Sequence, residues 1–206
     1  MRRSHRLQIH RMVKMNSKII SFMVMMGALG NILFLISYHV GLISPGVTLD
    51  FSLIGAFIAG IFGGPIVGSV SGLFVGVLPG IFFGPLGNSS WLGLIGLPIG
   101  KGLTGLTSGL IAKGLNLNER RHCSFAIPVV LVSYVPECLF TVAYFLYLIP
   151  YFLGSGGGTG ILAFILPKAW AEVVIMSFLM AALAGNVGFK DFVNNFFKAT
   201  TQPKMK

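Results

Sequence analysis

Charged residues are scarce in this chain, and acidic residues are scarcer still. Only 10% of the 206 residues are charged, and five Asp and Glu stand against 15 Lys and Arg. Soluble domains carry about 25% charged residues, whereas this chain is 54% hydrophobic with a mean hydropathy of +0.85. Such a chain cannot cover a water-facing surface. The composition therefore excludes an ordinary soluble domain and predicts an integral membrane protein.

The sequence also lacks a disulfide framework and a nucleotide-binding loop. Its two cysteines, Cys123 in a polar connector and Cys138 in an apolar run, belong to different membrane depths, so no disulfide is expected. The stretch "GLPIGKGLTG" around Lys101 departs from the Walker A pattern twice, with Ile95 at the first Gly position and Gly102 after the lysine. The histidines are scattered near ends and loops, and neither a metal-ligand cluster nor a nucleophile–base pair is apparent. We expect no enzyme activity and no cofactor.

Apolar segments predict an all-α integral membrane protein, a compact bundle of six transmembrane helices. The six segments are about 19–43, 48–63, 65–86, 93–114, 125–153 and 161–189. A spanning helix needs about 17–25 residues, so the second segment is short. It meets the third segment at "GGP", a tight turn. Basic tails, 1–18 and 190–206, flank the six-span membrane domain 19–189.

Lysines and arginines predict the orientation of these segments. With six crossings, every Lys and Arg outside the spans falls on the cytoplasmic side, and so do both termini. If the second segment were re-entrant, Lys113, Arg120 and Arg121 would lie outside, so the charge bias favours a true crossing. Because the positive charges gather in the tails and one connector, the net charge of +10 does not indicate nucleic acid.

Glycine recurs at every fourth position through the second and third segments. This glycine seam consists of Gly60, Gly64, Gly68, Gly72, Gly76, Gly80 and Gly84. Residues four apart share a helix face, and glycine there lets another helix approach closely. Packing inside the protein is the favoured interpretation, and a surface for a partner membrane protein is the alternative. The first span carries a smaller group, for which both interpretations stay open: Gly27, Ala28, Gly30 and Asn31.

Polar and charged side chains recur within the last three spans. The candidate substrate-binding residues are Lys101 on the fourth span, Glu137, Thr141 and Tyr144 on the fifth, and Lys168 and Glu172 on the sixth. A charge at mid-membrane costs about 2.5–3.5 kcal/mol on insertion scales, so such residues usually face a bundle interior and are paired. Two structural ion pairs, including Lys168 with Glu172 one turn away, are one interpretation. A ligand pocket is slightly favoured, because buried pairs rarely improve on apolar packing.

Residues outside the last three spans have weaker signals. Asn88 and Trp91, both in the connector "GNSSW", are two further candidate substrate-binding residues. The tryptophan is predicted to help close the pocket, although an interfacial anchor also accounts for it. His39 and Asp50, near the outer ends of the first two spans, are interpreted as interfacial residues.

Four features together resemble the substrate-binding (S) components of energy-coupling factor transporters, over roughly residues 19–189. They are the six spans, their orientation, the polar outer halves of the last three spans, and the run "PGVTLDFSLIGAFIAGIFGGPIVGSVSG". The resemblance implies a protein of the prokaryotic plasma membrane that captures a vitamin or related micronutrient from outside, in a pocket formed by the last three spans and the external loops. It implies partners too, a transmembrane coupling protein and a pair of cytoplasmic ATPases. Many family members dock through Ala-x-x-x-Ala in the first span, where this chain has only the group at 27–31.

These observations predict a micronutrient-binding subunit of an importer. Lys101 and Lys168 would receive an anionic group of the substrate, and Glu137 or Glu172 would receive a donor. A stand-alone ion-coupled carrier or channel, with the two glutamates as proton sites, is the first alternative. A membrane sensor module is the second.

Overall fold

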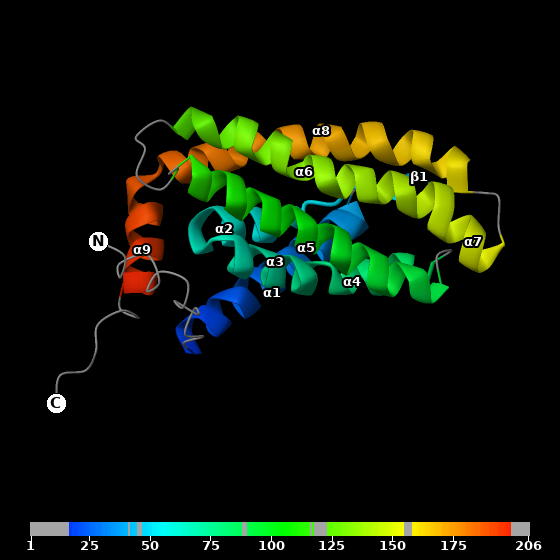
Figure 1. The fold of residues 1–206 in the computed structure, drawn as a ribbon, viewed down its shortest axis with the longest axis horizontal. Coiled ribbons are helices and arrows are strands. Elements are labelled where there is room, and N and C mark those ends of the chain that lie inside the picture. Colours follow the sequence, from blue (N-terminus) through cyan, green and yellow to red (C-terminus); the bar gives the residue numbers. More distant parts are fainter. Residues whose placement is uncertain are drawn as a thin grey trace, which may run out of the picture.

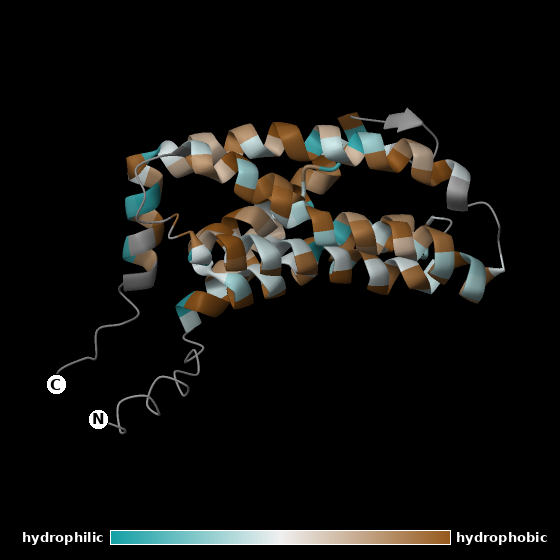
Figure 2. Ribbon diagram, turned by 45° about the horizontal axis from the view of Figure 1, so that its top comes forward, coloured by the Kyte–Doolittle hydropathy of each residue, from teal (hydrophilic) through white to brown (hydrophobic). Residues whose placement is uncertain are grey.

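The structure is a computed structural model in which long helices lie side by side along one axis (Figure 1). It describes residues 17–40, 42–44, 47–87, 90–115, 117, 123–154 and 158–198. In these residues, five helical stretches are long and apolar enough to cross a membrane. Figure 2 shows that hydrophobic residues predominate along these helices. The predicted all-α membrane class is confirmed to this extent.

The elements follow one another as a series of helices with one short strand pair. They are α1 (Ser17–Val40), β1 (Leu42–Ser44), β2 (Val47–Thr48), α2 (Leu53–Gly63), α3 (Pro65–Val75), α4 (Val77–Phe83), α5 (Ser90–Gly114), η1 (Cys123–Phe125), α6 (Ala126–Ala143), η2 (Tyr144–Leu148), α7 (Ile149–Leu153), α8 (Gly158–Gly185) and α9 (Val187–Lys198). The strands β1 and β2 pair antiparallel. Helices α3 and α4 form one spanning stretch, and so do α6, η2 and α7.

Helix α2 differs from the full spanning helix predicted over 48–63. It has 11 residues, about 16 Å at 1.5 Å per residue, which is short of a hydrocarbon core of about 30 Å. Its residues 53–62 are all buried, so other helices surround it. Non-helical backbone at membrane depth is tolerated where protein covers it. That condition explains how residues 49–52 remain outside any helix although the segment is apolar.

Helix α8 ends earlier than the predicted sixth span, which extended to residue 189. Asn186 separates it from α9, and its side-chain oxygen accepts a hydrogen bond from the backbone N–H of Phe189 at 3.1 Å. A side-chain cap of this kind starts a new helix. Helix α9 then lies across the end of the bundle at which α1 begins (Figure 1), with Phe196 and Phe189 packed on Phe22 and Phe62.

The glycine seam faces α5 inside the protein, in agreement with the favoured interpretation. A Cβ atom on Gly68 would overlap the carbonyl oxygen of Gly105, and one on Gly72 would overlap the carbonyl oxygen of Lys101. Gly64 has a different role. It joins α2 to α3 with φ +90°, a conformation that favours glycine, and so makes the predicted turn. Because glycine has no side chain, the backbones of α3 and α5 come into direct contact along this seam.

Candidate functional site

A cavity of about 420 Å³ lies between α6, η2 and α8 on one side and α4, α5 and the segment before α2 on the other. Six of the predicted substrate-binding residues line it: Lys101, Glu137, Thr141, Tyr144, Lys168 and Glu172. The fold therefore brings together side chains from three helices that sequence reasoning grouped by span alone. Their role in binding a substrate stays a prediction.

Lys101 is buried at the wall of this cavity and is paired within the protein. Its side chain is 3% exposed, and its Nζ atom lies 2.7 Å from Asp50 Oδ2 and 2.6 Å from Ser52 Oγ. The other oxygen of Asp50 accepts the backbone N–H of Ser52 at 2.9 Å. The interpretation of Asp50 as an interfacial residue was therefore wrong, because the segment before α2 turns inward. The lysine's partner in the structure is this aspartate, whereas a glutamate or a ligand anion was expected.

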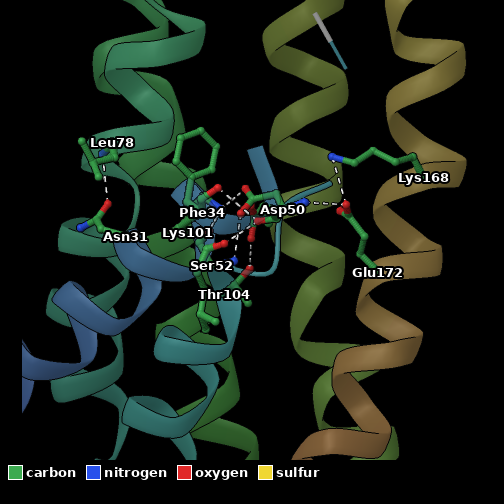
Figure 3. Close-up of polar contacts among 12 residues, drawn as sticks. Asn31, Phe34, Asp50, Ser52, Leu78, Lys101, Thr104, Lys168 and Glu172 are labelled. Atoms are coloured by element: carbon green, nitrogen blue, oxygen red, sulfur yellow. Dashed lines mark hydrogen bonds and ion pairs between the residues drawn. The ribbon is translucent and has the colours of Figure 1, made fainter. Parts of the chain in front are cut away.

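Lys168 and Glu172 form the pair that their spacing on one helix indicated. The distance from Lys168 Nζ to Glu172 Oε1 is 3.3 Å. The same oxygen accepts the backbone N–H of Asp50 at 2.6 Å. The two ion pairs are thus joined through one residue, and Figure 3 shows the series of contacts from Lys101 through Asp50 and Glu172 to Lys168. This network ties α5 and α8 to the non-helical segment before α2.

Glu137 is the third carboxylate of the cavity, and it stands apart from that network. Its Oε2 atom accepts a hydrogen bond from the Thr104 hydroxyl on α5. No ion pair reaches it within the part of the chain that the structure describes. A Cβ atom on Gly100 would lie 3.4 Å from the Glu137 Cγ, and one on Gly96 would lie 2.6 Å from the Tyr144 ring. These glycines of "GLPIGKGLTG" leave room on α5 for the cavity side chains of α6 and η2.

Aromatic side chains cover both sides of the cavity, and sequence reasoning missed most of them. Phe140 and Tyr144 stand one turn apart, with ring centroids 6.3 Å apart. Tyr38 of α1 and Phe82 of α4 line the opposite wall with centroids 4.9 Å apart. An aromatic residue in an apolar sequence gives no signal of its own, and only the packing of α1 against α4 reveals this wall.

One further candidate, Trp91, is not among the described residues that line the cavity. Trp91 is 49% exposed and lies against Phe152, with ring centroids 5.6 Å apart, which fits the alternative of an interfacial anchor. Asn88 lies outside the described residues.

The small-residue group of α1 mostly makes contacts within the protein. A Cβ atom on Gly27 would meet Phe74, and one on Gly30 would meet Val75, each at 2.6 Å. The Asn31 side chain donates to the Phe74 carbonyl at 2.9 Å. Ala28 is exposed. Docking of a partner on this group stays a prediction, and three of its four residues are committed to packing on α3.

The arrangement suits binding of an organic molecule through charge, hydrogen bonds and aromatic contacts. In the described residues, no group of three or more His, Cys, Asp and Glu is placed to hold a metal ion. The chain matches no protein-family model, no curated protein and no solved structure.

Proposed function

We propose that this chain is the membrane-embedded substrate-capture subunit of an importer of the energy-coupling factor type. The observation that carries the proposal is the cavity, which lies inside a bundle of apolar helices and is lined by five charged side chains. Charged side chains inside an apolar bundle are costly, and they commonly mark a ligand or ion site. In this proposal the substrate is a small, vitamin-like micronutrient taken from outside the cell.

The proposed topology has six crossings, with both termini in the cytoplasm of a prokaryote and the bundle in its plasma membrane. The second crossing combines the non-helical segment 49–52 with α2. Burial of α2 among other helices supports this crossing, because no backbone polar group there needs to face lipid. The distribution of Lys and Arg supports the orientation.

The proposed partners are a transmembrane coupling protein and a pair of cytoplasmic ATPases. The sequence around Lys101 is no Walker A loop, and the backbone of that stretch packs against α3. ATP hydrolysis is therefore assigned to the partners. Ala28, exposed on α1, is the member of the small-residue group that remains accessible for docking.

A stand-alone ion-coupled carrier remains the second candidate, because Glu137 is a cavity carboxylate that forms no ion pair in the described chain. Such a group can take up and release a proton. The two candidates differ in whether transport needs ATP.

Two measurements test the proposal. Native mass spectrometry of the protein purified in mild detergent should show a small molecule that co-purifies one to one. Proteoliposomes containing the chain alone should not accumulate that molecule, whereas co-expression with a coupling protein and ATPases should give ATP-dependent uptake. Accumulation by the chain alone, driven by an ion gradient, would reject the proposal in favour of the carrier.

A further inference from the structure

The charged side chains of the cavity do not balance. Lys101 and Lys168 are its only lysines in the described chain, and Asp50, Glu137 and Glu172 are its carboxylates. Each lysine is already paired with a carboxylate, at 2.7 Å and 3.3 Å. One carboxylate, Glu137, is therefore in excess.

From this excess we infer that the cavity takes a ligand bearing a cationic group attached to a flat apolar ring, with the cation held by Glu137. The inference rests on the proposed function, since it names the substrate class of the same cavity. It replaces the expectation that Lys101 and Lys168 receive an anion. An anionic group would compete with Asp50 and Glu172 for lysines that are already paired. It would also add a negative charge to a cavity in which the carboxylates outnumber the lysines.

The position of Glu137 fits a ligand cation. Thr104 supplies a hydrogen bond to Oε2, and no hydrogen bond to Oε1 is found in the described part of the chain. Glu137 is half-buried and lines the cavity, so its Oε1 atom is available to a ligand there. A ligand ammonium or amidinium would complete its set of partners with a charge-assisted hydrogen bond.

The aromatic residues around the cavity indicate where the ring of the ligand would lie. Phe140 and Tyr144 continue along α6 and η2, and Tyr38 and Phe82 face the cavity from α1 and α4. Aromatic pairs favour stacked or edge-to-face contacts, and a cation near such rings is also attracted to their faces. A ligand in which a ring is joined to a cation would place its cation at Glu137 and its ring between these aromatic side chains.

A second observation points independently to a ligand. Thr48, at the end of β2, lines the cavity and is 2% exposed. Its hydroxyl has no hydrogen-bond partner among the described residues. A buried hydroxyl without a partner is uncommon in native structures. A polar atom of the ligand would satisfy it, so the ligand carries a hydrogen-bonding group in addition to its cation.

The test uses probes that share a ring and differ in charge. Tryptamine, tryptophol and indole-3-acetate carry an amine, an alcohol and a carboxylate, and phenethylamine, phenethyl alcohol and phenylacetate repeat the series on a smaller ring. Binding to the purified full chain in detergent is measured by calorimetry and thermal stabilisation. We expect each amine to bind about tenfold more tightly than its alcohol, the scale of one charge-assisted hydrogen bond, and each carboxylate to bind most weakly.

Variants then locate the effect. Glu137→Gln keeps the side-chain shape and should abolish the preference for amine over alcohol, by weakening amine binding about tenfold more than alcohol binding. Thr48→Val should weaken tryptamine binding about three- to tenfold, the scale of one neutral hydrogen bond. Ser71→Ala is the matched control, because Ser71 is also buried with a hydroxyl lacking a described partner but does not line the cavity.

The wild-type probe series alone decides the inference, whatever the stability of the variants. Carboxylates binding as tightly as amines, or no amine binding at all, would overturn it. The proposed function fails separately. ATP-dependent uptake of an anionic nutrient would overturn the cationic ligand and keep the importer, whereas amine binding without any ATP-dependent uptake would keep the ligand class and reject the importer.

Discussion

The ion pair between Lys101 and Asp50 gives the sharpest prediction about stability. The two side chains lie 2.7 Å apart at the inner wall of the cavity, and the lysine is 3% exposed. Breaking a buried ion pair by removing one partner costs about 3–5 kcal/mol, because the other charge is left buried without compensation. Lys101→Met should reach this range, since Met fills similar space without the charge.

The two single variants should differ, and the structure gives the reason. Glu137 and Glu172 also lie within electrostatic range of the Lys101 ammonium. In Asp50→Asn the lysine therefore retains nearby negative charge, and we expect a loss of about 1–3 kcal/mol, the cost of weakened hydrogen bonds to a charged group. In Lys101→Met, Lys168 is the only cavity lysine of the described chain that is left to offset the three carboxylates. We therefore expect the larger loss of unfolding free energy in this variant.

The assay is equilibrium unfolding in mixed micelles, with the double variant Lys101→Met/Asp50→Asn completing a cycle. We expect the double variant to be more stable than Lys101→Met alone, with a coupling energy of about 1–3 kcal/mol. Additive losses would refute the argument, because they would mean that the two side chains do not form a buried pair. Equal losses in the single variants would refute the role assigned to the two glutamates.

Three further predictions concern packing and polar contacts. Gly105→Ala should destabilise the bundle by about 1–3 kcal/mol, because its Cβ would overlap the Gly68 carbonyl oxygen; the control Gly114→Ala, with open space around it, should change the unfolding free energy little. Asn31→Leu should cost about 1–3 kcal/mol in the same assay, since it removes hydrogen bonds that join α1 to α3 and α4, and an unchanged midpoint would contradict this. Lys168→Met should cost about 1–3 kcal/mol, less than Lys101→Met, because that lysine is 16% exposed and its pair is longer, although Glu172 is left buried; a loss equal to that of Lys101→Met would contradict the difference in burial.

Much of the helical framework could be predicted from local sequence. Long apolar runs predicted five of the stretches that the structure shows as helices long enough to cross a membrane, and the four-residue glycine period predicted a close helix contact. The length of α2 could not be predicted in this way. An apolar segment looks the same whether it is helical throughout or begins with non-helical backbone, and the inward position of Asp50 depends on Glu172, 122 residues later.

The candidate site divides in the same way. The residue types determined that Lys101, Glu137, Lys168 and Glu172 had to lie inside the bundle, because lipid cannot accommodate their charges. The partners could not be determined, because pairing depends on which helices are neighbours and on the face that each turns inward. The sequence by itself thus determined a membrane protein with buried charges. Only the tertiary structure decided that Asp50 forms the ion pair with Lys101, so that Glu137 is the cavity carboxylate without an ion pair in the described chain.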